Sequence, residues 1–368
     1  MRNRRGEAVN RVIFRVVCII VGMIFVFSGV VKAIDPLGTV YKIEDYLFAM
    51  HLDFFTPLAF VASFALIIAE FLAGSLLVLN VRFKLGLWLT TLFMVAMTPL
   101  TLWIALYNPV SDCGCFGDAI TISNWATFWK NIVISALLVY LWICRAVCRE
   151  WLVKKVEWCV AAVMALIPFV IGVMAIRNLP MIDFRPYKIG ANIYEQMQLP
   201  EGAVPDQYDV TFVYAKDGVN EEFSLQDAPI GDSTWVFVEQ RTELIKLGDE
   251  PAIHDFFIIT PDGDDFTDLI LLDEGRTYFF VMYDLSKTNE KMMVKLNEIH
   301  KKAEAEGARV IALTSSDSMI EEFKLKHNLQ FDFALTDPIQ LKTMVRSNPG
   351  VVVMENGIVI DKYNPKNK

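Results

Sequence analysis

Histidine is scarce in this 368-residue sequence, and neither a His-x-x-x-His nor a Cys-x-x-Cys motif occurs. Because zinc sites commonly use such closely spaced ligands, we predict no metal site. An excess of basic residues is also missing: the formal net charge is −9, so we predict no nucleic-acid partner. The last of the six cysteines is Cys159, which excludes thiol exchange by the C-terminal half alone.

Hydrophobic residues, in contrast, make up 54% of the chain, above the roughly 45–50% usual in soluble domains. They concentrate in the first half, where five apolar windows reach the ~17–25 residues that cross a bilayer as a helix. These windows comprise residues 12–33, 56–79, 85–107, 126–144 and 157–176. The first window exceeds the ~7–15 apolar residues of a signal peptide, so we interpret it as an uncleaved membrane anchor.

Basic residues gather in alternate connectors of the predicted spans, which places them on one face of the membrane. Before the first span lie Arg2, Arg4, Arg5, Arg11 and Arg15. The connector between the second and third spans contains Arg82 and Lys84, and that between the fourth and fifth contains Arg145, Arg149, Lys154 and Lys155. The positive-inside rule makes this face cytoplasmic. We therefore predict a multi-pass protein of a bacterial inner membrane, embedded in lipid, with a cytoplasmic N-terminus and residues 177–368 in the periplasm.

A Cys-x-Cys pair, Cys113 and Cys115, lies in the short connector between the third and fourth spans. On the exported, oxidising side, such a pair becomes a disulfide or acts as a redox couple. A bridge across one residue closes a very small ring, and strained disulfides have the more oxidising potentials that suit a catalyst. We predict a catalytic pair, with a structural disulfide or two unpaired thiols as alternatives. Because the carboxylate of Asp112 disfavours a thiolate at its neighbour, Cys115 is the better placed attacking sulfur.

Three segments of the membrane half carry motifs: Phe27-Ser28-Gly29-Val30-Val31-Lys32 followed by Asp35-Pro36; Ala69-Glu70; and Asp112-Cys113-Gly114-Cys115-Phe116-Gly117-Asp118. Together they resemble the DoxX/MauE-like redox-associated membrane proteins. The resemblance covers about the first 150 residues and implies a four-helix membrane domain, residues 1–150, linked to thiol–disulfide or quinone chemistry. Residues 151–180 then form a fifth transmembrane helix that tethers the exported domain.

Glu70 lies near the centre of the second span, where a carboxylate is costly enough to be a functional candidate. Counting ~1.5 Å per helical residue puts Thr98 and Ser135 at similar depth, so the three form a predicted polar layer. This layer is a proton or quinone-headgroup site; alternatively, a protonated Glu70 only hydrogen-bonds a neighbouring helix. Lys32, at the outer end of the first span, is interpreted as a snorkelling anchor.

The C-terminal half has the composition of a soluble protein. Residues 181–205 are predicted to be a linker, and residues 206–368 an exported domain that begins with a β-rich extension. Alternation of apolar residues predicts strands at 208–214, 221–225, 234–239 and 256–260, with a turn at residues 216–218. A parallel β-α-β unit and a hairpin follow, with strands 277–283, 309–314, 351–354 and 358–363 and helices 290–306, 318–327 and 338–345.

This order of elements resembles the thioredoxin fold, in its TlpA/peroxiredoxin-like branch, over roughly the last 90 residues. Asn348-Pro349-Gly350-Val351-Val352 matches the position of the cis-proline loop. Where that fold carries its redox cysteines, this chain reads Asp284-Leu285-Ser286-Lys287-Thr288-Asn289. The resemblance therefore implies a redox-inactive thioredoxin-like domain that binds a partner through the Pro349 surface, or one that serves only as a spacer.

These patterns predict a membrane α-helical bundle followed by an exported α/β domain. In the favoured interpretation, Cys113 and Cys115 exchange disulfides with an exported thiol-containing or envelope protein and pass electrons to a membrane quinone. The quinone is assigned by analogy with other small membrane proteins that generate disulfides. The main alternative is a non-enzymatic envelope scaffold that presents the redox-inactive domain. A third is a small-molecule carrier that uses Glu70, which the lack of an evident inverted repeat disfavours.

Overall fold

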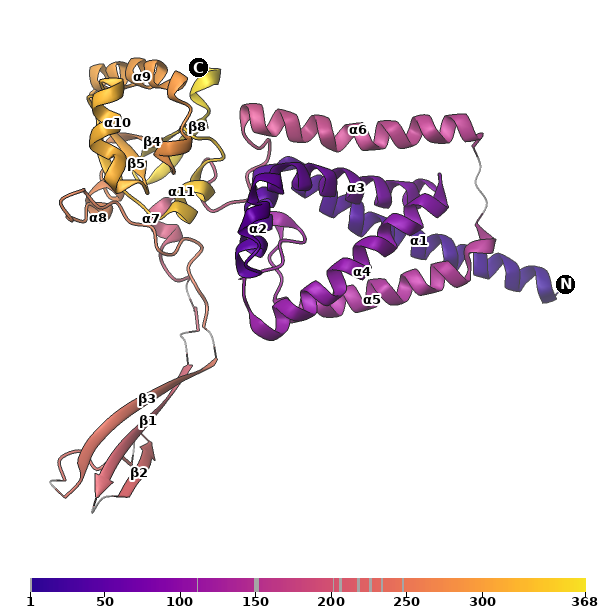
Figure 1. The fold of residues 1–368 in the computed structure, drawn as a ribbon, viewed down its shortest axis with the longest axis horizontal. Coiled ribbons are helices and arrows are strands. Elements are labelled where there is room, and N and C mark those ends of the chain that lie inside the picture. Colours follow the sequence, from indigo (N-terminus) through magenta and orange to yellow (C-terminus); the bar gives the residue numbers. More distant parts are fainter. Residues whose placement is uncertain are drawn as a thin grey trace.

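The computed structural model consists of a bundle of long helices with a mixed α/β part at one end (Figure 1). It describes residues 2–368 except residues 111, 149–151, 201, 205–206, 217–218, 225–226, 233 and 247. Several predicted features therefore lie outside the described residues, namely the basic residue Arg149, the linker end at Pro205, the turn residues Asp217 and Gly218, and the strand end at Leu225.

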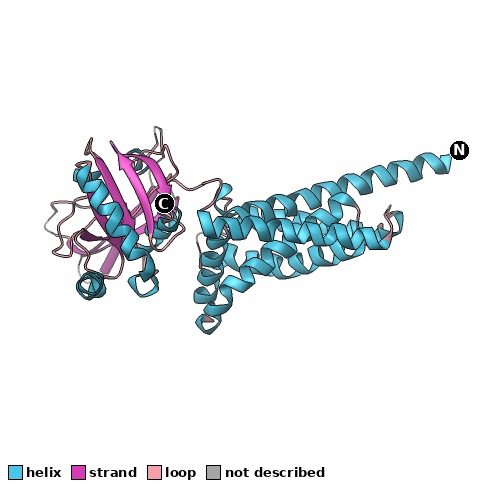
Figure 2. Ribbon diagram, turned by 90° about the horizontal axis from the view of Figure 1, so that it is seen from above, coloured by secondary structure: helices cyan, strands magenta, loops and turns pink. Residues whose placement is uncertain are grey.

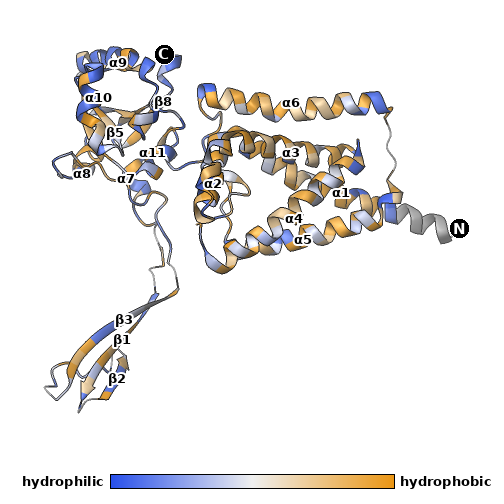
Figure 3. Ribbon diagram, viewed as in Figure 1, coloured by the Kyte–Doolittle hydropathy of each residue, from blue (hydrophilic) through white to orange (hydrophobic). Residues whose placement is uncertain are grey.

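Within the described residues, five helices are long and apolar enough to cross a membrane, and the chain is a multi-pass membrane protein. They are α1 (Arg2–Ile34), α3 (Ala59–Leu79), α4 (Phe83–Tyr107), α5 (Asn124–Ile143) and α6 (Lys154–Asn178). Apolar residues extend along most of their length in Figure 3. Each predicted span coincides with one of these helices, because a helix satisfies its own backbone hydrogen bonds where lipid offers none.

Glycines allow the helices of the bundle to approach closely. α1 and α3 meet at Gly22 and Gly74, where a Cβ added to Gly74 would lie 2.5 Å from the Gly22 carbonyl oxygen. α6 meets α3 at Gly172, where an added Cβ would lie 3.0 Å from the ring of Phe64. The fifth helix therefore packs against the bundle in addition to connecting it to the C-terminal part.

A helix that hydropathy does not predict, α2 (Pro36–Ala49), lies across one end of the bundle (Figure 1). Asp35 caps it by accepting a hydrogen bond from the N–H of Gly38 at 3.1 Å, and Pro36 occupies its first turn. A short 3-10 turn, η1 (Asp53–Leu58), leads into α3. The loop between α4 and α5 and the C-terminal part lie at this same end, opposite the N-terminus (Figures 1 and 2).

The C-terminal part is built on a five-stranded sheet of order β6-β5-β4-β7-β8. Its strands are β4 (Arg276–Val281), β5 (Arg309–Thr314), β6 (Asp332–Leu335), β7 (Gly350–Glu355) and β8 (Ile358–Tyr363). β4, β5 and β6 run parallel, whereas β7 is antiparallel to β4 and pairs with β8 as a hairpin. The predicted β-α-β unit and hairpin are confirmed. The predicted strand at residues 256–260 is wrong, because Ile259 makes only isolated bridges.

Helices cover both faces of this sheet, with α9 (Met293–Ala305) and α10 (Ile320–His327) against Phe280 and Phe331. The other face is covered by α8 (Thr267–Leu271), α11 (Pro338–Met344) and the segment that contains α7 (Ile193–Gln196). Tyr187 and Ile193 of that segment are fully buried there. Two residues of the predicted linker 181–205 thus belong to the core.

A separate antiparallel sheet extends away from the rest of the chain (Figure 1). It consists of β1 (Gln207–Lys216), β2 (Val219–Ser224) and β3 (Val236–Lys246), in the order β2-β1-β3. Its two ends meet where the N–H of Asp249 donates to the carbonyl of Val204 at 2.8 Å, while the N–H of Val204 donates to the Asp249 carboxylate at 3.0 Å. The predicted β-rich extension is therefore an insertion between two segments of one core.

Candidate functional site

The two loop cysteines lie side by side at the end of the bundle that faces the C-terminal part. Their sulfur atoms are 2.8 Å apart, within a small movement of the ~2.05 Å disulfide bond length. Cys113 is buried, with 8% of its surface exposed, and Cys115 is partly buried. The loop thus holds the pair ready to form or break a bond, while limiting contact of either sulfur with solvent.

Two glycines shape the loop around the sulfurs. Gly114 has a φ of +62° and Gly117 a φ of +52°, which side chains rarely adopt. The N–H of Gly114 donates to the Asp112 carboxylate at 2.6 Å, and the N–H of Gly117 donates to the carbonyl of Gly114 at 3.1 Å. A Cβ at Gly114 would lie 2.8 Å from Cγ of Lys42, so a larger residue does not fit there.

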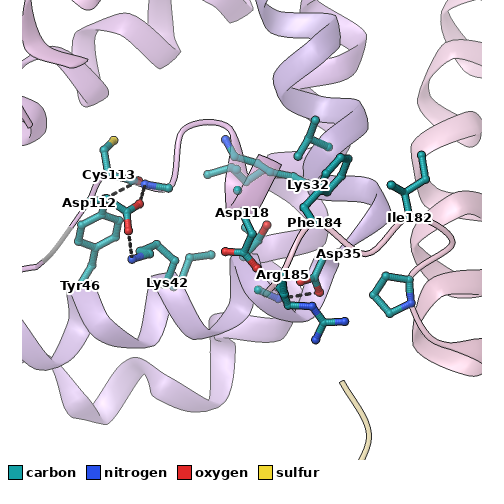
Figure 4. A pocket seen from close by; sticks show the side chains of 18 of the residues that line it. Lys32, Asp35, Lys42, Tyr46, Asp112, Cys113, Asp118, Ile182, Phe184 and Arg185 are labelled. Carbon is teal, nitrogen blue, oxygen red and sulfur yellow. Dashed lines mark hydrogen bonds and ion pairs between the residues drawn. The ribbon is translucent and has the colours of Figure 1, made fainter. Parts of the chain in front are cut away.

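Helix α2 fixes the loop from one side (Figure 4). The ammonium group of Lys42 lies 3.0 Å from a carboxylate oxygen of Asp112. The hydroxyl of Tyr46 donates a hydrogen bond to the carbonyl of Cys113 at 2.6 Å. Because Asp112 is neutralised by Lys42, its charge opposes thiolate formation less than the sequence suggests.

The bundle fixes the loop from the other side, through a buried polar cluster. The hydroxyl oxygen of Ser28 lies 2.5 Å from the carbonyl oxygen of Cys115 and 2.7 Å from a carboxylate oxygen of Glu70. Lys32 lies 2.8 Å from the other oxygen of Glu70. The interpretation of Lys32 as a snorkelling anchor is wrong, because its side chain is buried and turned to α3. The cluster brings charge next to the sulfurs in a poorly hydrated setting.

The two thiols differ in acidity. The pKa of Cys115 is lowered to about 6, first by the hydrogen bond from Cys113 and then by the ammonium groups of Lys130 and Lys32, which together outweigh the opposing effect of burial. The same hydrogen bond, together with burial, raises the pKa of Cys113. The reduced pair therefore holds one proton near neutral pH, with the negative charge on Cys115.

Two cavities flank the pair. The outer one, about 730 Å³ including space open to solvent, lies between α2, the end of the bundle and the C-terminal part, and Cys113 contributes to its wall (Figure 4). The inner one, about 490 Å³, extends into the bundle, and both Cys113 and Cys115 line it. Its remaining wall combines the apolar side chains of α1, α4 and α5 with Ser28, Lys32, Glu70, Lys130 and Asn131.

The predicted polar layer is present only in part. Thr98 and Ser135 lie at matching depth, with their hydroxyl oxygens 3.3 Å apart. Among the described residues, no hydrogen bond joins either of them to Glu70, which pairs instead with Lys32 and Ser28. Depth along a helix is readable from sequence, whereas the face that each residue presents depends on how the helices rotate against one another.

Pro349, the predicted partner-docking residue, is itself buried and follows a cis peptide bond from Asn348. Asn348 donates a side-chain hydrogen bond to the carbonyl of Asp284 at 2.8 Å, so the proline loop and the segment after β4 are neighbours. Arg346, three residues earlier, reaches the bundle. It lies 2.8 Å from the carboxylate of Asp35 and 3.0 Å from that of Asp118.

Four residues of the site are not singled out by sequence reasoning: Lys42, Tyr46, Lys130 and Arg346. Ser28 was named only as part of a motif, without a role. Only one sequence pattern pointed to the contacts around the cysteine pair. Ser28 and Lys32 are four residues apart in α1 and share a helix face, so a carboxylate on a neighbouring helix has two partners there. The other contacts join elements that are distant in sequence.

Comparison with known protein families matches two segments of the chain. Residues 10–144 match the family described as Methylamine utilisation protein MauE, over α1 to α5 and including the cysteine loop. The predicted resemblance of the membrane half is thus confirmed for this family. Residues 208–246 match a domain of unknown function, DUF8463, which coincides with the inserted sheet β1–β3. A search of curated proteins found no match.

Proposed function

We propose that this protein is a membrane thiol–disulfide oxidoreductase in which Cys113 and Cys115 exchange disulfides with an exported thiol-containing protein. The observation that carries the proposal is the position of the two sulfurs, 2.8 Å apart between an outer and an inner cavity. A structural disulfide requires neither cavity. The match of residues 10–144 to a methylamine utilisation protein supports an accessory role in a redox system.

Partner oxidation starts with the pair as a disulfide. A partner thiolate attacks the sulfur of Cys113, which lines the outer cavity, and the bond to Cys115 breaks. Cys115 leaves as a thiolate, because a thiol of low pKa is the better leaving group. A second partner thiolate then attacks the mixed disulfide and releases Cys113. The partner becomes a disulfide, having given two electrons to the pair, and of the two protons of its thiols one ends on Cys113 and the other is released.

A membrane quinone in the inner cavity is the proposed electron acceptor. A bound quinone would supply a two-electron acceptor for the reduced pair, with one proton coming from Cys113 and the second through the neighbouring Lys32–Glu70 pair, so that the disulfide is restored. A cavity with mainly apolar walls and a limited set of polar groups has the usual character of a small-molecule site. Lys32 and Glu70, 2.8 Å apart beside it, offer exchangeable protons close to both sulfurs.

The orientation and the C-terminal fold complete the proposal. Basic connectors support a cytoplasmic N-terminus in a bacterial inner membrane, which puts the cysteine loop in the oxidising periplasm. The strand order β6-β5-β4-β7-β8 supports a thioredoxin-like fold for residues 256–363. Because this part lacks cysteine, its role is binding and not thiol exchange.

A second candidate is a non-enzymatic scaffold of the cell envelope. The inserted sheet favours it, because the side chains of Val236, Phe237, Val238 and Ile245 are exposed on β3. Exposed apolar side chains on a projecting sheet are typical of surfaces that contact other proteins. In this alternative the cysteine pair would only stabilise its loop, by a small amount, since a one-residue ring removes little chain entropy.

Serine variants distinguish the two candidates. Cys115→Ser leaves Cys113 able to hold a partner covalently, so this variant should accumulate a mixed disulfide on a non-reducing gel. The double variant Cys113→Ser/Cys115→Ser should accumulate none and should fail to complement a deletion strain. Cys144→Ser is the matched control, since Cys144 lies at the opposite end of the bundle, and it should behave as wild type. Full complementation by the double variant, with no trapped partner in Cys115→Ser or Cys113→Ser, would leave only the scaffold.

A further inference from the structure

The contact between the C-terminal part, residues 179–368, and the bundle is polar. Each apolar core cluster of the described residues lies wholly within one of the two parts. Between them, the hydroxyls of Tyr41 and Tyr283 lie 3.4 Å apart, and the ammonium group of Lys342 sits 4.8 Å from the ring centre of Tyr41. An interface without a shared apolar core permits two domains to separate.

The C-terminal part covers the cysteine pair from outside. The segment directly after α6 forms one wall of the outer cavity, where Ile182, Phe184 and Arg185 line it together with Lys32 and Asp118 (Figure 4). The connection to α6 is Leu179, whose φ of +80° and ψ of 160° suit glycine better than any other residue. Here we call residues 179–368 the cover.

Arg346 makes ion pairs that join the cover to the bundle. Arg346 is 6% exposed, and its guanidinium lies between the carboxylates of Asp35, at the start of α2, and Asp118, three residues after Cys115. Gly38 makes room for it, because a Cβ there would lie 3.0 Å from a guanidinium nitrogen and 2.9 Å from the Asp35 carboxylate. The cradle formed by Asp35, Tyr41 and Asp118 is thus shaped for one cation.

Removal of the cover leaves this cradle with two carboxylates and no cation. The ring of Tyr41, which now faces Arg346 at 5.2 Å and Lys342 at 4.8 Å, adds a surface that attracts positive charge. Asp118 belongs to the cysteine loop itself and lines the outer cavity together with Cys113, so a cation bound there shares that cavity with the sulfur of Cys113. A protein that brings a thiol to Cys113 gains affinity from an arginine or lysine next to that thiol.

We propose that residues 179–368 are a removable cover of the cysteine pair, and that the thiol partner takes the place of Arg346 by inserting its own cationic side chain into the Asp35–Tyr41–Asp118 cradle. The covered state protects the pair from unspecific thiols. The second half of this proposal rests on the proposed function, because it assumes exchange with a partner. The first half concerns access alone and is tested without any redox step.

Access is measured on the full-length protein, reduced and in detergent, with a polyethylene glycol maleimide and mass spectrometry of the peptide that contains Cys113 and Cys115. Arg346→Gln should raise the rate of modification about tenfold or more, because it removes a buried charge from its two partners. Gly38→Ala should raise it as well, by crowding the guanidinium with no change of charge. Arg276→Gln is the control, since Arg276 pairs with Glu355 inside the cover.

Unchanged modification rates in both Arg346→Gln and Gly38→Ala, with thermal unfolding like wild type, would overturn the cover. If Arg346→Gln fails to fold, Gly38→Ala decides alone. A rate raised equally by Arg276→Gln would also overturn it, since general loosening of the C-terminal part would then be the cause.

Partner recognition is tested with two synthetic peptides that differ in one residue, Cys-Arg in one and Cys-Glu in the other. The arginine peptide should reduce the oxidised pair about tenfold faster, and Asp118→Asn should abolish this preference while Asp53→Asn, on an exposed residue outside the cradle, keeps it. Equal rates for the two peptides would overturn cation recognition. If dithiothreitol reduces the pair but neither peptide does, the proposed function fails, whereas the maleimide result on the reduced protein still decides the cover.

Discussion

Replacing Cys113 by alanine should raise the pKa of the Cys115 thiol, whereas replacing it by serine should keep that pKa low. The largest cause of the low value, about 6, is the hydrogen bond that Cys113 donates across 2.8 Å. Serine retains a donor at this position and alanine does not. Without the donor, burial opposes the ammonium groups of Lys130 and Lys32, and the pKa should rise toward its ordinary value of 9.0.

The size of the effect decides what to measure. A difference between 9.0 and about 6 corresponds to about 4 kcal/mol of thiolate stabilisation. At pH 7 the thiolate fraction would fall from about 90% to about 1%. A thiolate of higher pKa is, however, intrinsically more nucleophilic, with a Brønsted coefficient of ~0.4–0.5 for thiol exchange. For this difference in pKa, the thiolate that remains would react roughly 16- to 32-fold faster. The net loss of rate at pH 7 is therefore only about 3- to 6-fold.

The pH midpoint is the better observable, because it is independent of intrinsic reactivity. The assay follows the reaction of each variant with a small aromatic disulfide from pH 5 to pH 10. Because the pKa of Cys115 is lowered, the Cys115 thiol of the Cys113→Ser variant should stay reactive above pH 6 and lose its reactivity as pH falls through about 6. Reactivity of Cys113→Ala should already be lost as pH falls through about 9. The background lacks the other thiols, Cys18, Cys144, Cys148 and Cys159.

Equal midpoints for the two variants would refute this reasoning. If both lie near 6, the nearby ammonium groups set the acidity of Cys115 and the hydrogen bond does not. If both lie near 9, neither the bond nor the charges act as the geometry indicates.

Further predictions concern the structure around the pair. Lys32→Met or Glu70→Gln should each lower stability by roughly 3–5 kcal/mol in thermal unfolding, because either leaves a buried partner alone. The losses should not add in the double variant, and additive losses would contradict direct pairing. Gly114→Ala should cost about 1–3 kcal/mol for its positive φ and should slow the reaction of the pair; wild-type behaviour would refute the described loop. A short Gly-Ser loop in place of residues 208–246 should leave the remaining protein folded by limited proteolysis, because the two ends of the insertion are hydrogen-bonded to each other.

The membrane helices were readable from sequence because composition alone identifies them. The predicted span at residues 126–144 corresponds to α5, Asn124–Ile143, and the predicted strand at 309–314 has the bounds of β5. Helix α2 was not readable in the same way. Its Gly38 and its charged residues give no clean apolar stripe, since α2 contacts the bundle, the cysteine loop and the cover at once.

The site was partly readable as well. Cysteines in a short polar connector are conspicuous, so Cys113 and Cys115 were found by position alone. Their surroundings were not, because the Lys32–Glu70 pair depends on the rotation of α1 against α3. The contact between Arg346 and Asp35 joins residues 311 positions apart, and no local pattern encodes it.

The order of synthesis gives the Arg346 contact a temporal meaning. Asp118 precedes Arg346 by 228 residues, so the cysteine loop is complete long before the side chain that closes it exists. At ~5–20 residues per second, a nascent chain spends roughly 10–50 s with its thiol pair uncovered. During this interval the outer cavity lacks the wall that Ile182, Phe184 and Arg185 form beside Cys113. Under the proposed role of the cover, each newly made molecule is open to thiol exchange before its own C-terminal part limits access.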